Sequence, residues 1–127
     1  MSGRQLISSG APWEPVFGYS RAVRVRNQVF VAGTVGRNPD GSVPSGAYAQ
    51  AKRALEIVGE ALAEAGAGFE HVVRTRIFVI DIAFFDEVAR AHGEVFASIR
   101  PASSLVEVRR LVEPEYLLEI EADAVIQ

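Results

Sequence analysis

Two short segments in the first third of the chain have the hydrophobic pattern of β-strands. Residues 22–25 alternate apolar and polar side chains, and residues 29–32 form a continuous apolar run. These patterns are typical of a half-buried strand and a fully buried strand. Because only the short polar segment 26–28 separates them, we predict a β-hairpin. A further short strand is expected near Ile7.

Two later segments carry apolar residues at the spacing of an α-helix. The first stripe recurs every three or four residues and consists of Ala51, Leu55, Val58, Leu62 and Ala65. Gly66 predicts the C-terminal end of this helix, since glycine readily adopts the left-handed conformation found there. The second stripe consists of Phe85, Val88, His92, Val95 and Phe96. Its helix is expected to end at or before Arg100-Pro101.

The remaining pattern predicts strands over 72–79, 105–108 and 117–125, and a loop over 36–46 with a turn at Pro39-Asp40-Gly41. The predicted order is therefore β-β-α-β-α-β-β. Two helices cannot cover both faces of such a sheet, so we predict an α+β fold with both helices on one face. The other face is left for water or for a partner chain.

Composition limits the classes of protein to consider. The chain has 127 residues, of which 49% are hydrophobic, so we expect one globular domain over 1–127. The net charge of −3 makes a nucleic-acid partner a poor fit. The sequence lacks cysteine, which excludes a thiolate nucleophile and a disulfide framework. No run of apolar residues is long enough for a membrane span and no secretory signal is visible, so the expected compartment is the cytoplasm.

Charged residues alternate with apolar ones on two of the predicted strands. Glu119, Glu121 and Asp123 share one side of the last strand, while Arg74 and Arg76 share a side of the central strand. These groups either pair, within or between chains, or form a solvated face, and the sequence leaves both open. Alternate strand residues lie about 7 Å apart, which is too open for one metal ion, so no metal site is expected.

Several spaced segments resemble one known family. They are Tyr19-Ser20-Arg21-Ala22-Val23, Val31-Ala32-Gly33-Thr34, Ala49-Gln50-Ala51-Lys52-Arg53-Ala54-Leu55, the strand 72–79, the segment 100–108 and Leu118-Glu119-Ile120-Glu121-Ala122. By these motifs the chain is identified as a member of the reactive-intermediate deaminases, the YjgF/YER057c/UK114 or RidA-like family. The resemblance covers about residues 17–126. It implies a chorismate-mutase-like fold, a homotrimer, and small-metabolite clefts between subunits.

The resemblance also implies a reaction and the residues that perform it. Active members hydrolyse enamines or imines such as 2-aminoacrylate: water attacks the imine carbon and ammonia leaves, without a metal or organic cofactor. Glu119 matches the glutamate that orients the water, and Tyr19 matches a hydroxyl donor. The backbone amide of Leu105 and the residue Gly33 match ligand-binding positions.

Ser103 is the main departure from the family pattern. It stands in Pro101-Ala102-Ser103-Ser104, where the family has an arginine that clamps the substrate carboxylate. Losing that charge-assisted hydrogen bond costs roughly 1.5–3 kcal/mol, so we expect weak or no hydrolysis of 2-aminoacrylate-type imines. Substitute cations could be Arg100, Arg21 or Arg37, although each is expected to be a solvated surface arginine. Ala89 stands near the family's usual asparagine.

Two functions therefore remain open. One is a hydrolase of enamine, imine or related pathway-specific intermediates, including substrates without a carboxylate. The other is a non-catalytic trimeric module that binds a small metabolite. The acidic pI argues against a ribonuclease-like activity. In either case we expect Tyr19, Ser103, Leu105 and Glu119 to line one cleft at a subunit boundary, and His92 to be a packed histidine with one hydrogen bond.

Overall fold

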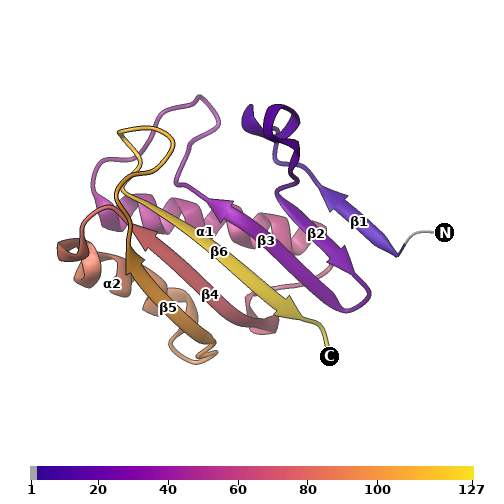
Figure 1. Cartoon of the computed structure of the whole chain (residues 1–127). Helices are drawn as coiled ribbons and strands as arrows, with labels where there is room; N and C mark the ends of the chain where they lie inside the picture. Colours follow the sequence, from indigo (N-terminus) through magenta and orange to yellow (C-terminus); the bar gives the residue numbers. More distant parts are fainter. Residues whose placement is uncertain (1–2) are drawn as a thin grey trace.

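Two long helices pack on one face of a six-stranded sheet in the computed structural model, which describes residues 3–127 (Figure 1). The strands are β1 (Arg4–Ile7), β2 (Ala22–Val25), β3 (Gln28–Thr34), β4 (Val72–Val79), β5 (Ala102–Glu107) and β6 (Leu118–Val125). The helices are α1 (Ala47–Glu64) and α2 (Phe85–Phe96), with short helical turns η1 (Glu14–Gly18), η2 (Phe69–His71) and η3 (Ile82–Phe84).

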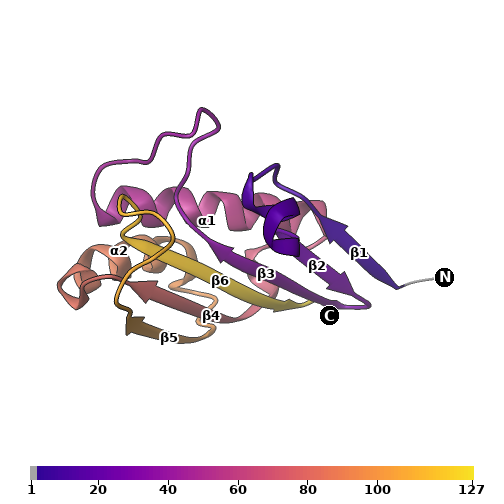
Figure 2. The ribbon, with the colours of Figure 1, turned by 45° about the horizontal axis from the view of Figure 1, so that its top comes forward.

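The strand order across the sheet is β1-β2-β3-β6-β4-β5. β4 and β5 are parallel and are connected through α2, whereas every other neighbouring pair in this sheet is antiparallel. Figure 2 shows α1 and α2 together behind the sheet, with the opposite face free of helices apart from the turn η1. The predicted α+β fold, with a mixed sheet and both helices on one face, is confirmed.

The core lies between the helices and the sheet. Its largest fully buried side chains include Leu55 and Leu62 of α1, Val88 of α2, and Leu118 and Ile120 of β6. Side chains on β6 alternate between buried and partly exposed along the whole strand, as the sequence pattern predicts. Burial of these apolar side chains fixes which face of β6 turns toward the helices, and this orientation places Glu119 on the other face.

The largest error in the predicted boundaries concerns β5. The strand begins at Ala102 and ends at Glu107, whereas the apolar pattern predicts 105–108. Ser103 and Ser104 lack strand-like hydrophobicity, but backbone pairing with β4 includes them: Ser103 lies opposite Thr75 and Ser104 opposite Arg76. β5 is an edge strand with mostly exposed side chains, so burial does not reveal its start.

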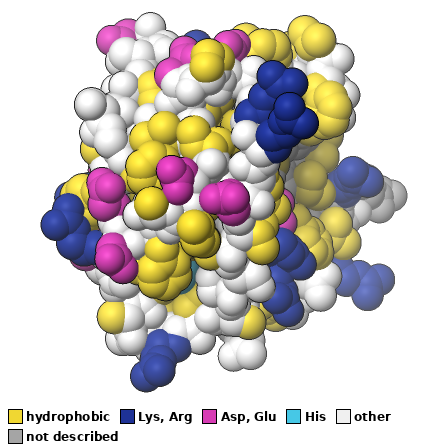
Figure 3. Space-filling model, turned by 60° about the vertical axis from the view of Figure 1, so that its left-hand side comes forward, with side chains coloured by type: hydrophobic (Ala, Val, Ile, Leu, Met, Phe, Trp, Pro, Cys, Tyr) yellow, Lys and Arg dark blue, Asp and Glu magenta, His cyan; other side chains and the backbone are white. Residues whose placement is uncertain are grey.

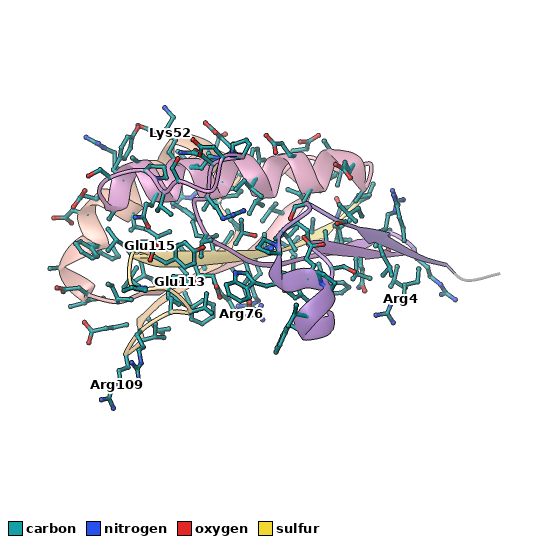
Figure 4. The ribbon with its side chains drawn as sticks, turned by 90° about the horizontal axis from the view of Figure 1, so that it is seen from above. Arg4, Lys52, Arg76, Arg109, Glu113 and Glu115 are labelled. Carbon is teal, nitrogen blue, oxygen red and sulfur yellow. The ribbon has the colours of Figure 1, made fainter. Side chains whose placement is uncertain are left out.

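The face of the sheet away from the helices combines charged and apolar side chains. Arg76 Nη1 lies 3.1 Å from Glu121 Oε1 and 3.3 Å from Asp123 Oδ2, which confirms pairing within the chain. Figure 4 labels Arg76 on the side of the sheet away from α1. Phe30 is 45% exposed and Val106 47% exposed on the same face. Figure 3 shows further hydrophobic side chains among acidic ones on the side of the molecule at the left of Figure 1. Among residues 3–127, no helix is long and apolar enough to cross a membrane.

Candidate functional site

Glu119 lies near the start of β6 on the helix-free face, opposite Phe78 of β4. Its carboxylate packs against the backbone of Gly33 near the end of β3. A methyl group at Gly33 would lie 2.7 Å from Glu119 Cδ and 3.0 Å from its Cγ, which is too close for unstrained atoms. The absence of a side chain at Gly33 therefore gives the Glu119 carboxylate its place. Gly33 and Glu119, both predicted site residues from the sequence, are therefore in direct contact.

Arg21 connects the groups around this contact. Its Nη1 donates to the Gly33 carbonyl oxygen at 2.7 Å and to Thr34 Oγ1 at 3.0 Å. Its Nε donates to Ser9 Oγ at 3.2 Å, and its Nη2 donates to the Tyr19 hydroxyl oxygen at 3.0 Å. Arg21 is only 6% exposed, so the expectation that it is a solvated surface arginine is wrong. Local oxygen acceptors replace water around the buried guanidinium.

These bonds also limit what Arg21 can do for a ligand. A guanidinium has five N–H donors, and the four bonds within the chain leave one on Nη2. One remaining donor cannot form the two parallel hydrogen bonds by which arginine clamps a carboxylate. Arg21 is therefore a fixed positive charge beside Glu119, and it does not replace the missing clamp.

The Tyr19 hydroxyl is oriented by the same arginine. Its oxygen accepts from Arg21 Nη2, and the Arg21 guanidinium lies 5.3 Å from the centre of the Tyr19 ring. Since the oxygen accepts this bond, the phenolic proton is free to donate to a ligand. Tyr19 also lines an open cavity of about 580 Å³ beside η1, together with Ile7, Ser8, Glu14 and other residues of the N-terminal segment.

Glu14 anchors the N-terminal segment and was not nominated by the sequence. Its Oε2 accepts from Ser9 Oγ at 2.6 Å, and Ser9 Oγ in turn accepts from Arg21 Nε. Burial raises the pKa of Glu14, but hydrogen bonds from Ser9 and Ser8 outweigh it, and the net pKa is lowered. Glu14 therefore stays ionised and balances the buried Arg21 through Ser9.

The pKa of Glu119 moves in the opposite direction. Burial raises it, Arg21 lowers it by attraction, and Glu121 raises it by repulsion, with a net increase. No hydrogen bond contributes to this shift, and within residues 3–127 the carboxylate has no hydrogen-bond donor. A carboxylate with a raised pKa and free acceptor oxygens is suited to take a proton from water.

Two loops stand beside the same end of the sheet, 35–46 after β3 and 108–117 before β6 (Figure 1). Gln50 holds them together: its Nε2 donates to the carbonyl oxygens of Pro44 at 3.1 Å and Glu115 at 3.0 Å. Burial raises the pKa of Tyr116 in the second loop, and the positive charge of Arg37 in the first loop offsets only part of this increase.

The other nominated residues lie elsewhere. Ser103 and Leu105 of β5 are paired with Thr75 and Ile77 of β4, whose side chains turn toward the helices. Arg100 is exposed in the connection between α2 and β5, with φ of 58°. Ser103 and Glu119 therefore lie on opposite faces of the sheet and about 10 Å apart along the strand direction. Within one chain the four nominated residues do not line a single cleft.

His92 is packed, as the sequence predicts. Its Nε2 lies 2.9 Å from Thr75 Oγ1, and its ring centroid lies 4.6 Å from that of Phe96. Burial lowers the pKa of His92, which keeps the ring neutral at pH 7. Among the residues that the structure describes, no cluster of His, Asp and Glu suits a metal ion.

Comparison with known proteins decides the family. The profile of the family described as endoribonuclease L-PSP matches residues 9–126. The chain belongs to this family. It is the same YjgF, or RidA-like, family that the sequence motifs resemble.

Individual relatives agree with this assignment. An uncharacterized protein of Streptomyces coelicolor is 40% identical over 93% of this chain and 89% of its own length. The 2-iminobutanoate/2-iminopropanoate deaminase of rat is 35% identical over 96% of this chain and 90% of its own. A solved YjgF/YER057c/UK114 family structure from Mycobacterium tuberculosis has a TM-score of 0.88 at 46% identity, covering 97% of this chain and 99% of its own. The fold of the family is thus shown for the chain.

Arg21 and Glu14 are residues around the candidate site whose structural roles sequence reasoning missed. Arg21 was considered only as a substitute cation, and Glu14 not at all. A signal for Arg21 existed: it stands between Tyr19 and the buried Ala22, next to a strand start. Nothing in the sequence pattern indicates Glu14, because its partners are the short side chains of a loop.

Proposed function

We propose that the protein hydrolyses small imines or enamines to a carbonyl compound and ammonia, without a cofactor, in clefts that adjacent subunits of a homotrimer complete. Family membership supports this reaction class, because several relatives carry the name of an imine deaminase. A net charge of −3 gives no support to RNA cleavage, which the description of the family names.

The observation that carries the proposal is the state of Glu119. Its carboxylate is half-buried, rests on the Gly33 backbone, has a raised pKa, and is left without a protein donor in the described part of the chain. Among the described residues no buried side-chain oxygen lacks a hydrogen-bond partner, so the Glu119 oxygens reach solvent. A carboxylate that is held against backbone and keeps accessible acceptor oxygens is available to a water molecule and a substrate.

The reaction follows from these groups. Glu119 accepts a proton from water while the water oxygen bonds to the imine carbon, and the imine nitrogen takes a proton from solvent. In the resulting carbinolamine, protonated Glu119 returns its proton to the amino nitrogen, the C–N bond breaks to release ammonia, and the hydroxyl proton passes to solvent, which leaves the carbonyl compound. Tyr19 donates a hydrogen bond to the polar group that forms on the reacting carbon. General base assistance of this kind typically contributes about 10²–10⁴-fold to the rate.

The substrate class follows from the charges. Ser103 is neutral, and Arg21 has one free donor, so neither clamps a carboxylate. We infer a preference for imines without a carboxylate beside the reacting carbon. Imines that amine oxidation produces have this character, whereas those from amino-acid oxidation or dehydration carry the carboxylate.

Subunit assembly is needed to bring the two halves of the site together. The helix-free face exposes Leu6, Phe30 and Val106, which are 61%, 45% and 47% exposed. Apolar side chains at this density on an open sheet face favour burial against another copy of the chain. We expect sedimentation to give a trimer at micromolar concentration, and a stable monomer would contradict the composite site.

The decisive assay compares two imine sources. Imines are generated with an amine oxidase or with an amino-acid oxidase, and their loss is followed against the uncatalysed rate. We expect the wild-type protein to accelerate hydrolysis of the uncharged imine and to act weakly or not at all on 2-iminopropanoate. Glu119→Gln should lower the rate at least about 100-fold. Asp123→Asn, which removes a carboxylate from the same strand face, is the matched control and should change the rate less than about twofold.

Two results would contradict the proposal. One is equal rates for wild type and Glu119→Gln. The other is binding of the imine's stable carbonyl product without any turnover of the imine, which would assign the protein as a metabolite-binding module.

A further inference from the structure

Three side chains from three elements form one hydrogen-bond network at the edge of the sheet. His92 of α2 lies 2.9 Å, through Nε2, from Thr75 Oγ1 of β4. Thr75 Oγ1 lies 2.8 Å from Ser103 Oγ of β5. Thr75 is completely buried, His92 is partly buried and Ser103 is exposed. The hydrogen-bond network therefore extends from the interior to the surface of an edge strand.

Counting hydroxyl protons shows that the two bonds depend on each other. Thr75 takes part in both bonds but has a single hydroxyl proton, so it donates one bond and accepts the other. When Thr75 donates to Ser103, His92 must donate from Nε2. When Ser103 donates to Thr75, Thr75 donates to an unprotonated Nε2, and the His92 proton is on Nδ1. The two arrangements of hydroxyl protons in this network correspond to the two neutral tautomers of His92.

We propose that His92, Thr75 and Ser103 form a proton relay that delivers a proton to, or takes one from, a ligand group held at Ser103. In delivery, the Ser103 proton passes to the ligand, the Thr75 proton passes to Ser103, and the Nε2 proton of His92 passes to Thr75. His92 Nδ1 takes up one proton from water. One proton enters and one leaves, and the ring is neutral before and after.

The surroundings of His92 suit this task. Its neighbours in the relay are two neutral hydroxyls, and the Phe96 ring packs against it. A neutral imidazole can exchange protons between its two nitrogens, whereas a permanently charged one could not accept a proton. The relay thus serves a ligand group that changes protonation during reaction, such as an imine nitrogen. This substrate class rests on the proposed function, whereas the coupling of the three side chains does not.

Nitrogen NMR of His92 tests the coupling directly. In the wild-type protein at neutral pH we expect the Nε2–H tautomer, since Thr75 donates to Ser103. Ser103→Ala removes the acceptor two bonds away and frees the Thr75 proton for His92, so the Nδ1–H fraction should rise. Ser104→Ala, on the opposite face of the same strand, is the control and should leave the tautomer ratio unchanged.

Kinetics provides the second readout. If the wild-type protein hydrolyses the amine-derived imine, Thr75→Val should lower kcat at least about tenfold with KM changed less than twofold, and Thr75→Ser should restore kcat. Failure of wild-type turnover would count against the proposed function alone. The relay is overturned if Ser103→Ala shifts the His92 tautomers no more than Ser104→Ala does, or if an active Thr75→Val variant keeps wild-type kcat.

Discussion

The two faces of the sheet hold two groups of polar residues that are built in different ways. On the helix-free face, Glu119 is positioned by backbone: the bare Cα of Gly33 makes room for its carboxylate, and Arg21 fixes the surrounding carbonyl and hydroxyl groups. On the helix face, backbone pairing with β4 places Ser103 opposite Thr75, and side-chain hydrogen bonds link its hydroxyl through Thr75 to His92. The first group is ionic and the second is neutral.

This difference suits the two groups to different steps of a reaction. The ionic group has a carboxylate with a raised pKa that can activate water, but its arginine, Arg21, keeps too few free donors to clamp an anionic substrate. The neutral group offers a hydroxyl whose proton can be replaced from the interior, but it has no carboxylate among its members. Under the proposed function, imine hydrolysis needs both groups, and one chain keeps them on opposite faces of the sheet.

Introducing a positive charge into the neutral group at Ser103 should produce the largest effect on the rate of hydrolysis. Ser103→Arg removes the hydroxyl at the end of the proposed relay but provides a charge-assisted bond for a substrate carboxylate. Because this carboxylate otherwise has no clamp, we expect its binding to outweigh the lost hydroxyl and hydrolysis of 2-iminopropanoate to rise about tenfold. Adding Glu119→Ala to this variant should abolish the gain, since the water would lose its base. The coupled amino-acid oxidase assay measures both steps. A gain that survives Glu119→Ala would show that the two groups do not act in one reaction.

Displacing Glu119 from its backbone support should have the next largest effect. A methyl group at Gly33 overlaps the end of a flexible side chain, so Gly33→Ala should move the carboxylate while costing little stability. We expect imine hydrolysis to fall about threefold to fivefold, with the free energy of unfolding lowered by less than about 1 kcal/mol. Gly93→Ala, where nothing lies within 4 Å of the new methyl group, is the matched control for rate. Equal rates for the two variants would show that the Gly33 contact does not position the base.

The smallest expected effect is on stability as a function of pH. Because the pKa of Glu119 is raised above its ordinary value of 4.5, the folded state binds this proton more tightly than the unfolded chain. Ionised Glu119 therefore destabilises the folded protein above the folded pKa, and this cost disappears as pH falls to 4.5. Glu119→Gln should be more stable than wild type to urea at pH 7, with the difference vanishing near pH 4. If the free energies of unfolding of Glu119→Gln and wild type differ by the same amount at pH 7 and pH 4, the raised pKa of Glu119 is contradicted.

The sequence predicts these regions with unequal success. The helices and the strands β4 and β6 follow from periodicity, because burial on one face imposes it. Glu119 and Gly33 follow from motif position. The burial of Arg21 does not follow, since its acceptors come from Ser9, Thr34 and the Gly33 backbone, which are distant in sequence or carry no side-chain signal. The face occupied by Ser103 depends on the register of an exposed edge strand, which hydrophobicity does not encode.

Mixing two impaired variants tests the composite site most directly. Glu119→Gln and Ser103→Ala each remove one group, and equal amounts of the two are unfolded together, refolded together and assayed for hydrolysis of the uncharged imine. If Glu119 of one subunit works with Ser103 of the next, random mixed trimers contain intact sites, and about a quarter of wild-type activity should return. Activity no higher than the average of the two parent variants would contradict a site shared between subunits.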